Sequence, residues 1–285
     1  MAVVSMIRRG SSTLWVGADL GGTWVRILAG DGRRRRRPLV LRAPSLQNRE
    51  KFFRAVWRRQ HWRGRAIGAL VIASRGIWTR AECRAFVGPL RGLAQRVRAV
   101  PDAHAAFLGA LGDRPGLLIL SGTGSIVVGH DGRGRWARGG GLGPLLGDEG
   151  SGFWLGREWL RAAAATNYLA ARSVVTAPDA VARIAALAPL VMRRARRGDR
   201  RARAVVASGQ VHLAGIAAQV AAELRLAEPV AVSWAGSVLG VPWFRAGLQR
   251  ALARGGMRAR WVAPESEPVV AASRLAENLS RRAPK

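Results

Sequence analysis

Two Gly-Thr turns carry residue types suited to binding an anion. They are Asp19-Leu20-Gly21-Gly22-Thr23 and Ser121-Gly122-Thr123-Gly124-Ser125. In both, glycines let the backbone turn tightly and bring N–H groups close to a phosphate, and hydroxyls add donors. The Asp19 carboxylate could also hold Mg²⁺ through water at the same strand end. Together the turns predict two binding sites for the phosphates of one polyphosphate, although either turn alone is also typical of a plain hairpin.

A third glycine-rich segment carries two adjacent acids. Residues 139–156, GGGLGPLLGDEGSGFWLG, lead through Asp148 and Glu149 into an expected helix. Carboxylates on such a loop can accept hydrogen bonds from sugar hydroxyls, or one of them can cap the helix. Capping needs only one acid and few glycines, so the pattern favours a hydroxyl-binding loop.

A fourth segment ends a strand where a helix begins. In residues 232–240, VSWAGSVLG, the transition falls at Gly236 and Ser237. A helix N-terminus that starts with glycine can pack against a purine or a ribose. On its own this pattern is also common in αβ units without a ligand.

The elements that position these residues alternate between strands and helices. In the first part we expect strands at 14–20, 24–29, 39–41, 66–73 and 97–100, with helices at 48–61, 79–95 and from 102. In the second part we expect strands at 117–120, 126–128, 135–138, 230–234 and 258–262, with helices at 150–171, 179–197, 200–224, 238–253 and from 268. This order predicts mixed sheets covered by helices.

The second part repeats the first in its residues. LGGTWVRILAGDGR at 20–33 and LSGTGSIVVGHDGR at 120–133 share a Gly-Thr turn and an Asp-Gly-Arg turn at the same spacing. Each copy is a strand, a turn, a strand and a second turn. Chance similarity of two hairpins is the less favoured explanation. A duplication implies two lobes, each presenting a Gly-Thr turn to the cleft between them.

The chain of 285 residues has a formal net charge of +30, and Lys51 and Lys285 are its only lysines. Nearly complete use of arginine is typical of a codon bias, and no nucleic-acid-binding motif accompanies it. We expect non-specific, salt-sensitive binding of polyanions, with a dedicated nucleic-acid surface as the less favoured alternative. A P-loop is excluded, because neither lysine follows a GxxxxG loop.

The expected compartment is the cytoplasm, and no membrane span is expected. The single cysteine, Cys83, excludes an internal disulfide and a CxxC motif. The first residues lack the sustained apolar run of a signal peptide. The longest uncharged stretch, 204–222, carries Ser208, Gln210 and His212, which favours a core helix.

Taken together, DLGGT, SGTGS and LLGDEGSGFWLG resemble the BadF/BadG/BcrA/BcrD-type ATPase family, and within it the N-acetylglucosamine kinases. The resemblance runs from about Leu14 to Ala276; GDEGS is specific, whereas DxGGT is shared by other actin-like kinases. It implies an α/β, two-lobed actin-like ATPase (ribonuclease H-like) fold with duplicated βββαβαβα lobes. It also implies phosphorylation of an amino sugar by Mg·ATP, and a homodimer is a further expectation.

The resemblance assigns a role to each candidate residue. Two phosphate loops and an adenosine contact bind ATP through Gly21, Gly22, Thr23, Gly122, Thr123, Gly124, Gly236 and Ser237. The sugar contacts are Asn48, Asp102, Gly141, Leu142, Gly143 and Asp148. Asp102, in VPDAHAAF, is the implied base for the attacking hydroxyl, which fits its place at a strand end that opens a helix. Asp19 is the implied Mg²⁺ residue.

Three departures from the family pattern leave the acceptor open. Leu142 stands where the sugar kinases often have a tryptophan, and Ser74-Arg75 replaces the usual small pair after the fourth strand. Ala271-Ala272 stands where Gly-Ala is usual. Two other functions stay open: an ATPase that activates a partner reductase or dehydratase, and a sensor without catalysis. Cys83 alone does not match the paired cysteines of the activators, and the retained acids argue against a sensor.

The expected lobes differ in their motifs. Residues 1–101, completed by the C-terminal helix 268–285, form the N-terminal lobe with the first phosphate loop. Residues 102–267 form the C-terminal lobe with the second phosphate loop, the GDEGS loop and the adenosine motif.

Overall fold

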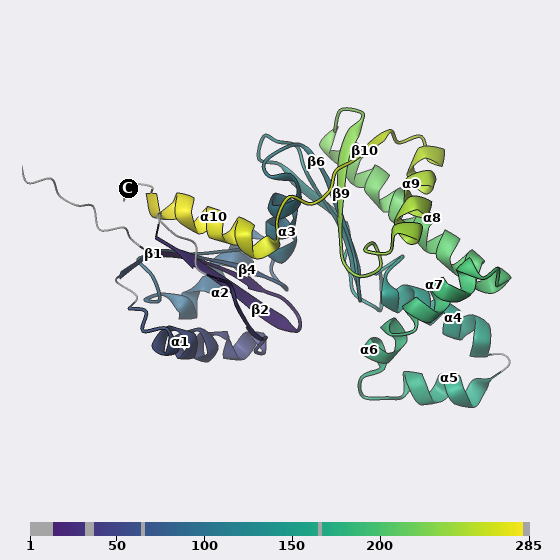
Figure 1. The fold of residues 1–285 in the computed structure, drawn as a ribbon, viewed down its shortest axis with the longest axis horizontal. Helices are drawn as coiled ribbons and strands as arrows, with labels where there is room; N and C mark the ends of the chain where they lie inside the picture. Colours follow the sequence, from purple (N-terminus) through teal and green to yellow (C-terminus); the bar gives the residue numbers. More distant parts are fainter. Residues whose placement is uncertain (1–13, 32–36, 64–65, 165–166, 282–285) are drawn as a thin grey trace, which may run out of the picture. The chain divides into compact units, whose positions relative to one another are not determined.

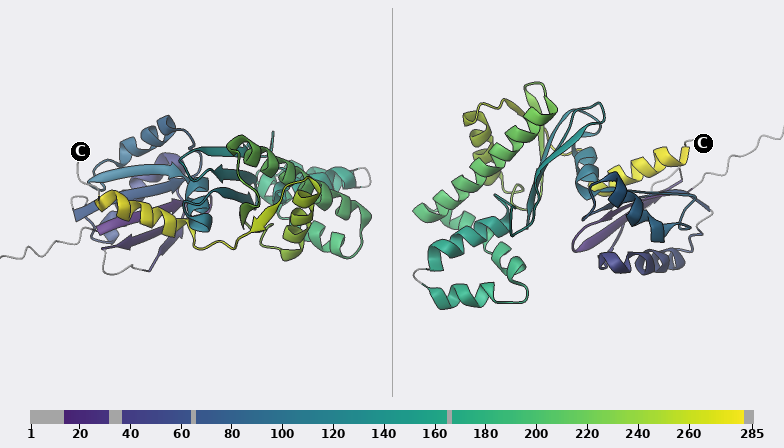
Figure 2. Two further views of the ribbon diagram at one scale, coloured as in Figure 1. Left: turned by 90° about the horizontal axis from the view of Figure 1, so that it is seen from above. Right: turned by 180° about the vertical axis from the view of Figure 1, so that it is seen from behind.

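The chain divides into two compact units, which Figures 1 and 2 show in a computed structural model. The structure describes residues 14–31, 37–63, 66–164 and 167–281. One unit runs to Gly109 and resumes at Ser266, and the other is Ala110–Glu265. The sequence placed the boundary before Asp102, whereas the structural division falls inside the helix that Asp102 opens. Asp102 therefore lies in the first unit.

The described part of the first unit contains a five-stranded mixed sheet in the order β3-β2-β1-β4-β5. Its strands are β1 (Leu14–Leu20), β2 (Trp24–Gly30), β3 (Leu39–Arg42), β4 (Ile67–Ser74) and β5 (Arg96–Pro101). β1 is antiparallel to β2 and parallel to β4, which is parallel to β5. Leu20 pairs with Ser74, and Ser74 pairs with Pro101. The carboxyl ends of three strands therefore lie side by side.

Helices cover both faces of this sheet. They are α1 (Arg49–Arg59), α2 (Arg80–Val87), α3 (Asp102–Leu111) and α10 (Pro268–Arg281). Val16 of β1 packs in a buried cluster with Phe53 of α1, whereas Trp15 packs in another with Ala272 of α10. Successive side chains of a strand point to opposite faces, so Asp19 lies on the same face as Trp15.

The second unit repeats the sheet of the first. Its strands, in the part that the structure describes, are β6 (Gly116–Ser121), β7 (Ser125–His130), β8 (Trp136–Gly140), β9 (Val230–Ala235) and β10 (Ala259–Trp261). They follow the order β10-β9-β6-β7-β8, with β6 antiparallel to β7 and parallel to β9. Strand for strand this matches the first sheet. The duplication predicted from two hairpins is confirmed and extends to the whole sheet.

The helices of the second unit are α4 (Gly152–Ala164), α5 (Tyr168–Val175), α6 (Ala180–Ala185), α7 (Ala188–Arg196), α8 (Arg200–Leu224) and α9 (Pro242–Arg254). The predictions of single helices over 150–171 and 179–197 are wrong. Asn167 starts α5, because its side chain accepts a hydrogen bond from the Ala170 N–H at 3.2 Å. Proline in the first turn of α7 starts that helix afresh.

Helix α8 runs along the second sheet and contacts β6, β7 and β8 (Figure 1). Val206, Leu213 and Val220 place it in the buried core of this unit. Of the described helices, it is the one long and apolar enough to cross a membrane by length and composition. Its packing on the sheet agrees with the core helix predicted from the sequence.

Candidate functional site

Three neighbouring strand ends of the first sheet lead directly into Gly21, Arg75 and Asp102. These residues follow the paired ends of β1, β4 and β5. Ligands of α/β sheets bind outside the carboxyl ends of such strands. The register therefore brings the first Gly-Thr turn, an arginine and the predicted base to one end of the sheet.

The first Gly-Thr turn offers N–H groups that the fold does not use. The Gly21 N–H donates to the Trp24 carbonyl at 3.1 Å. Gly22 and Thr23 are exposed, and their N–H groups donate to no acceptor among the described residues. Backbone donors seek a partner, so this turn suits an anion such as a phosphate.

Asp19 and Asp102 form a pair of like charges beside this turn. Burial, and then the charge of Asp102, raise the pKa of Asp19 to about 6, against a smaller opposing effect of Arg26. Within the described chain no hydrogen bond holds the Asp19 carboxylate. Burial also raises the pKa of Asp102, whose Oδ1 accepts a hydrogen bond from the Ala103 N–H at 2.8 Å. A buried carboxylate without a partner is suited to a cation.

The residues suit a magnesium ion rather than a closed metal cage. No cluster of three or more His, Cys, Asp or Glu side chains able to hold a metal occurs in the described parts of the chain. Mg²⁺ is usually held by one or two carboxylates and completes its shell with water and phosphate oxygens. The buried Asp19 carboxylate fits that requirement.

In the second unit, the Gly122 turn and the Gly236 turn are in contact. A Cβ at Gly236, where φ is +94°, would lie 2.3 Å from the Ser121 carbonyl oxygen. A Cβ at Gly122 would lie 3.8 Å from the Ser237 nitrogen, and the Val238 N–H donates to the Ser121 carbonyl at 3.0 Å. The predicted second phosphate loop and adenosine contact thus lie together.

The GDEGS loop is hydrogen-bonded to the second Gly-Thr turn. The Ser121 hydroxyl donates to the Gly150 carbonyl at 2.9 Å, and the Ser125 hydroxyl donates to the Glu149 carbonyl at 2.8 Å. The prediction that the hydroxyls of SGTGS serve a phosphate is therefore wrong for both serines, because they hold the loop. The exposed Thr123 has no such bond among the described residues.

Asp148 is held in a constrained conformation. Its φ is +62°, in the left-handed region that costs a non-glycine residue about 1–3 kcal/mol. Its Oδ1 accepts a hydrogen bond from the Ser125 N–H at 3.1 Å. Burial raises its pKa more than this hydrogen bond lowers it, and Glu149 raises it further. A Cβ at Gly124 would lie 2.9 Å from the same oxygen, so the carboxylate needs glycine there.

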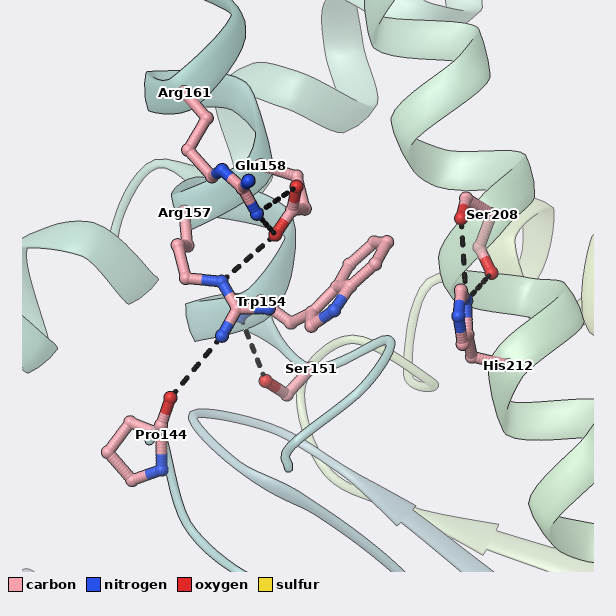
Figure 3. A network of polar contacts seen from close by, with 8 residues as sticks. All are labelled: Pro144, Ser151, Trp154, Arg157, Glu158, Arg161, Ser208 and His212. Carbon is pink, nitrogen blue, oxygen red and sulfur yellow. Dashed lines mark hydrogen bonds and ion pairs between the residues drawn. The ribbon is translucent and has the colours of Figure 1, made fainter. Parts of the chain in front are cut away.

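The loop before Asp148 carries the other predicted sugar contacts. Gly141 and Gly143 have φ of +70° and +79°, and Leu142 between them is 61% exposed. Figure 3 shows how α4 holds this loop: Arg157 Nη1 donates to the Pro144 carbonyl at 3.4 Å. The exposed Leu142 side chain is accessible to a ligand.

Ser151 and Trp154 anchor the start of α4 behind the GDEGS loop. The buried Ser151 hydroxyl accepts a hydrogen bond from the Trp154 N–H at 3.1 Å (Figure 3). The Trp154 ring lies 5.5 Å from the His212 ring of α8. The acids of the loop are thus supported by a packed helix start.

Asn48 lies apart from the two acids. It is exposed at the start of α1, and none of its described contacts reaches Asp19 or Asp102. Its segment does approach the loop after β4, since a Cβ at Gly76 would lie 3.3 Å from Leu46 Cδ1. The structure therefore brings Leu46, two residues before Asn48, near this loop, and no described contact joins Asn48 to the predicted base.

Arg75 is a site residue to which the sequence assigned no role. Its Nη1 donates to the Gly22 carbonyl at 3.0 Å, and its charge lowers the pKa of Asp102. In the sequence its only signal was a large basic residue where a small one is usual.

An α/β protein with two repeated sheets and glycine-rich turns at the ends of their parallel strands belongs to the actin-like class of nucleotide-binding folds. The sequence profile of the BadF/BadG/BcrA/BcrD ATPase family matches residues 97–276. The chain belongs to this family, and ATP is therefore its expected nucleotide.

Relatives agree with this assignment. The chain is 43% identical over 72 residues to an N-acetylmuramic acid/N-acetylglucosamine kinase of Clostridium acetobutylicum, a match that spans 25% of this chain and 24% of that relative. The structure of a putative N-acetylglucosamine kinase of Chromobacterium violaceum is 25% identical with a TM-score of 0.70, over 93% of this chain and 99% of that one. A ROK family glucokinase of Streptomyces griseus, 21% identical with a TM-score of 0.56 over the same shares, has the same fold. The predicted actin-like ATPase fold is confirmed.

Replacing Gly236 with alanine is expected to weaken ATP binding roughly ten- to a hundredfold, through strain at positive φ and a Cβ against the Ser121 carbonyl. Calorimetric titration with Mg·ATP measures this. Gly215→Ala in α8, where a Cβ would meet open space, is the control and leaves the affinity unchanged. A folded Gly236→Ala protein with native ATP affinity would contradict the adenosine role.

Proposed function

We propose that this protein is a cytoplasmic kinase that transfers the γ-phosphoryl group of ATP to a hydroxyl of an amino sugar, N-acetylglucosamine or a close relative. The observation that carries the proposal is the arrangement at the first sheet. There the Asp102 carboxylate lies at the end of β5 beside Asp19 and beside a Gly-Thr turn with unused N–H groups.

Each group has one task in the proposed reaction. The N–H groups of Gly22 and Thr23 bind phosphate oxygens, and Asp19 holds Mg²⁺, which would supply positive charge to the transferred phosphoryl group. The Ala103 N–H orients the Asp102 carboxylate, which accepts the proton of the attacking sugar hydroxyl. Phosphoryl transfer depends mainly on positioning and electrostatics, so no covalent intermediate is needed.

The sugar specificity is proposed to come from the GDEGS loop. The Asp148 carboxylate is buried, supported by Ser125 and raised in pKa, and an acceptor of this kind recognises sugar hydroxyls. Leu142 adds an exposed apolar surface in place of an aromatic ring. The kinase from Clostridium acetobutylicum, which matches this chain over 72 residues, is named for both N-acetylmuramic acid and N-acetylglucosamine. Its name supports an N-acetylated sugar as the substrate class.

Activation of a partner reductase is the alternative within this family, and the cysteine content argues against it. Cys83 is the single cysteine, and it lies half-buried on α2. An iron–sulfur cluster is held by several cysteine thiolates, which one cysteine per chain does not supply even across a dimer.

The proposal is tested by ADP formation in the presence of Mg·ATP and a panel of acceptors. N-acetylglucosamine, N-acetylmuramic acid, glucosamine and glucose are compared with water alone. We expect ADP release to depend on an N-acetylated sugar and to be slow without an acceptor. Acceptor-independent ADP release at an equal rate would reject the kinase and favour an ATPase.

Asp148→Asn is expected to raise the KM for the sugar roughly ten- to a hundredfold, because a hydrogen bond to a charged group contributes about 1.5–3 kcal/mol. The asparagine oxygen can still accept from the Ser125 N–H, so ATP affinity should be retained. Glu149→Gln, which changes the neighbouring acid, is the matched control and should leave the sugar KM unchanged. An unchanged sugar KM in Asp148→Asn would reduce the GDEGS loop to a structural element.

A basic patch supports the expected binding of polyanions. Exposed arginines gather where α7 ends and α8 begins: Arg193, Arg194, Arg196, Arg197, Arg200, Arg201 and Arg203. Asp199, the acid among them, lies 3.6 Å from Arg194 as an ion pair. A patch of this charge binds polyanions in a salt-sensitive way.

A further inference from the structure

Arg75 is held at the end of β4 by its backbone. Its N–H faces the Leu20 carbonyl of β1 at 3.5 Å, and its carbonyl accepts a hydrogen bond from the buried Ser74 hydroxyl at 3.0 Å. The positive φ of Gly76, +73°, turns the chain away directly afterwards. The arginine therefore leaves the sheet at a fixed point beside the first Gly-Thr turn.

The guanidinium of Arg75 lies within reach of both the phosphate turn and the base. Nη1 donates to the Gly22 carbonyl at 3.0 Å, and the charge lowers the pKa of Asp102. Among the described residues, no carboxylate forms an ion pair with it, Asp102 included. A guanidinium has five N–H donors, and the described residues offer it the Gly22 carbonyl as its hydrogen-bond acceptor. Most of its donors and its full charge are left for a ligand.

We propose that Arg75 binds the transferred phosphoryl group and stabilises the negative charge on its equatorial oxygens during transfer. This inference rests on the proposed function and adds a catalytic residue to it. A guanidinium matches phosphate oxygens with parallel N–H donors, and an arginine at a phosphoryl group acts where charge must be stabilised. The Gly22 carbonyl then serves to aim the side chain.

A purely structural role for Arg75 is the competing explanation. In that case the hydrogen bond to Gly22 would only hold the turn in shape. Loss of the arginine would then weaken binding of every nucleotide that the turn contacts, ADP included. The phosphoryl-binding role predicts instead that ADP affinity stays the same and that preference for a γ-phosphate is lost.

The test compares Arg75→Met, which removes the charge at similar length, with Arg75→Lys and with Arg84→Met as an exposed control on α2. Calorimetry measures the affinities for ADP and for a non-hydrolysable ATP analogue, and steady-state kinetics measures kcat and KM. We expect Arg75→Met to bind ADP normally, to lose the wild-type preference for the analogue, and to lower kcat on the order of a hundredfold. Arg75→Lys should retain part of the kcat and of the preference for the analogue, because lysine keeps the positive charge but lacks the parallel N–H donors of the guanidinium.

One result would overturn the inference. It is an unchanged ratio of analogue to ADP affinity in Arg75→Met, whether both affinities keep their wild-type values or both fall equally. Because the binding measurement needs no sugar, its result does not depend on which acceptor the enzyme uses. A wild-type protein that binds the analogue but phosphorylates no sugar would contradict the proposed function. The affinity ratio would still test whether Arg75 binds the γ-phosphate.

Discussion

Asp102→Asn is expected to lower kcat by roughly two to four decades while leaving Mg·ATP affinity nearly intact. The asparagine oxygen can still accept the Ala103 N–H, so the side chain keeps its orientation. What is lost is the capacity to accept the proton of the sugar hydroxyl. Removing this charge should also lower the pKa of Asp19, because Asp102 is the second cause that raises it.

The measurement is a steady-state assay of the purified variant with saturating sugar and ATP, together with calorimetric ATP titration. Asp113→Asn, an exposed acid in the loop after α3, is the control and should retain wild-type turnover. Undiminished kcat in Asp102→Asn would remove Asp102 from the mechanism.

Asp19→Asn is expected to abolish Mg²⁺-dependent turnover and, without ligands, to increase the free energy of unfolding at pH 8. The pKa of Asp19 is raised from 3.8 to about 6, a shift of about 2 units. At about 1.4 kcal/mol per unit, ionised Asp19 costs the folded state on the order of 2–3 kcal/mol. The folded state thus bears a cost for a charge that binding a cation would offset.

The size of this effect depends on pH. Below pH 3.8 the Asp19 carboxyl is protonated in the folded and unfolded states. The stability that the uncharged carboxyl gives to the wild-type folded state is therefore fully present there, and it is lost as the pH rises through about 6. The difference in free energy of unfolding between Asp19→Asn and the wild type should therefore be largest at pH 8 and shrink toward pH 4. Denaturant unfolding at several pH values measures it, with Asp113→Asn as the control. A variant less stable than the wild type at pH 8 would contradict this account of Asp19.

The strands and turns could be predicted because their signals are local. The predicted strand at 14–20 coincides with β1. The Gly-Thr repeat at 20–33 and 120–133 predicted the duplication that the two sheets show. The break before α5 also had a local signal in Asn167, a good helix cap, but the alanine-rich run around it favours a continuous helix.

The contacts within the site could not be predicted, because they join distant segments. Arg75 reaches Gly22 across 53 residues only because β1 and β4 are parallel neighbours. The Ser125 hydroxyl holds the GDEGS loop across 24 residues, although its type suits a phosphate equally well. The positive φ of Asp148 is imposed by the folded loop and has no counterpart in residue type.

Phosphorus NMR of the products distinguishes phosphorylation of a sugar from hydrolysis of ATP. The purified protein is incubated with Mg·ATP and N-acetylglucosamine, and the signals of ADP, inorganic phosphate and a sugar phosphate monoester are integrated. We expect ADP and sugar phosphate in equal amounts with little inorganic phosphate, and neither product in the Asp102→Asn sample. ADP formed with an equal amount of inorganic phosphate and no sugar ester would show that the protein is an ATPase and not a sugar kinase.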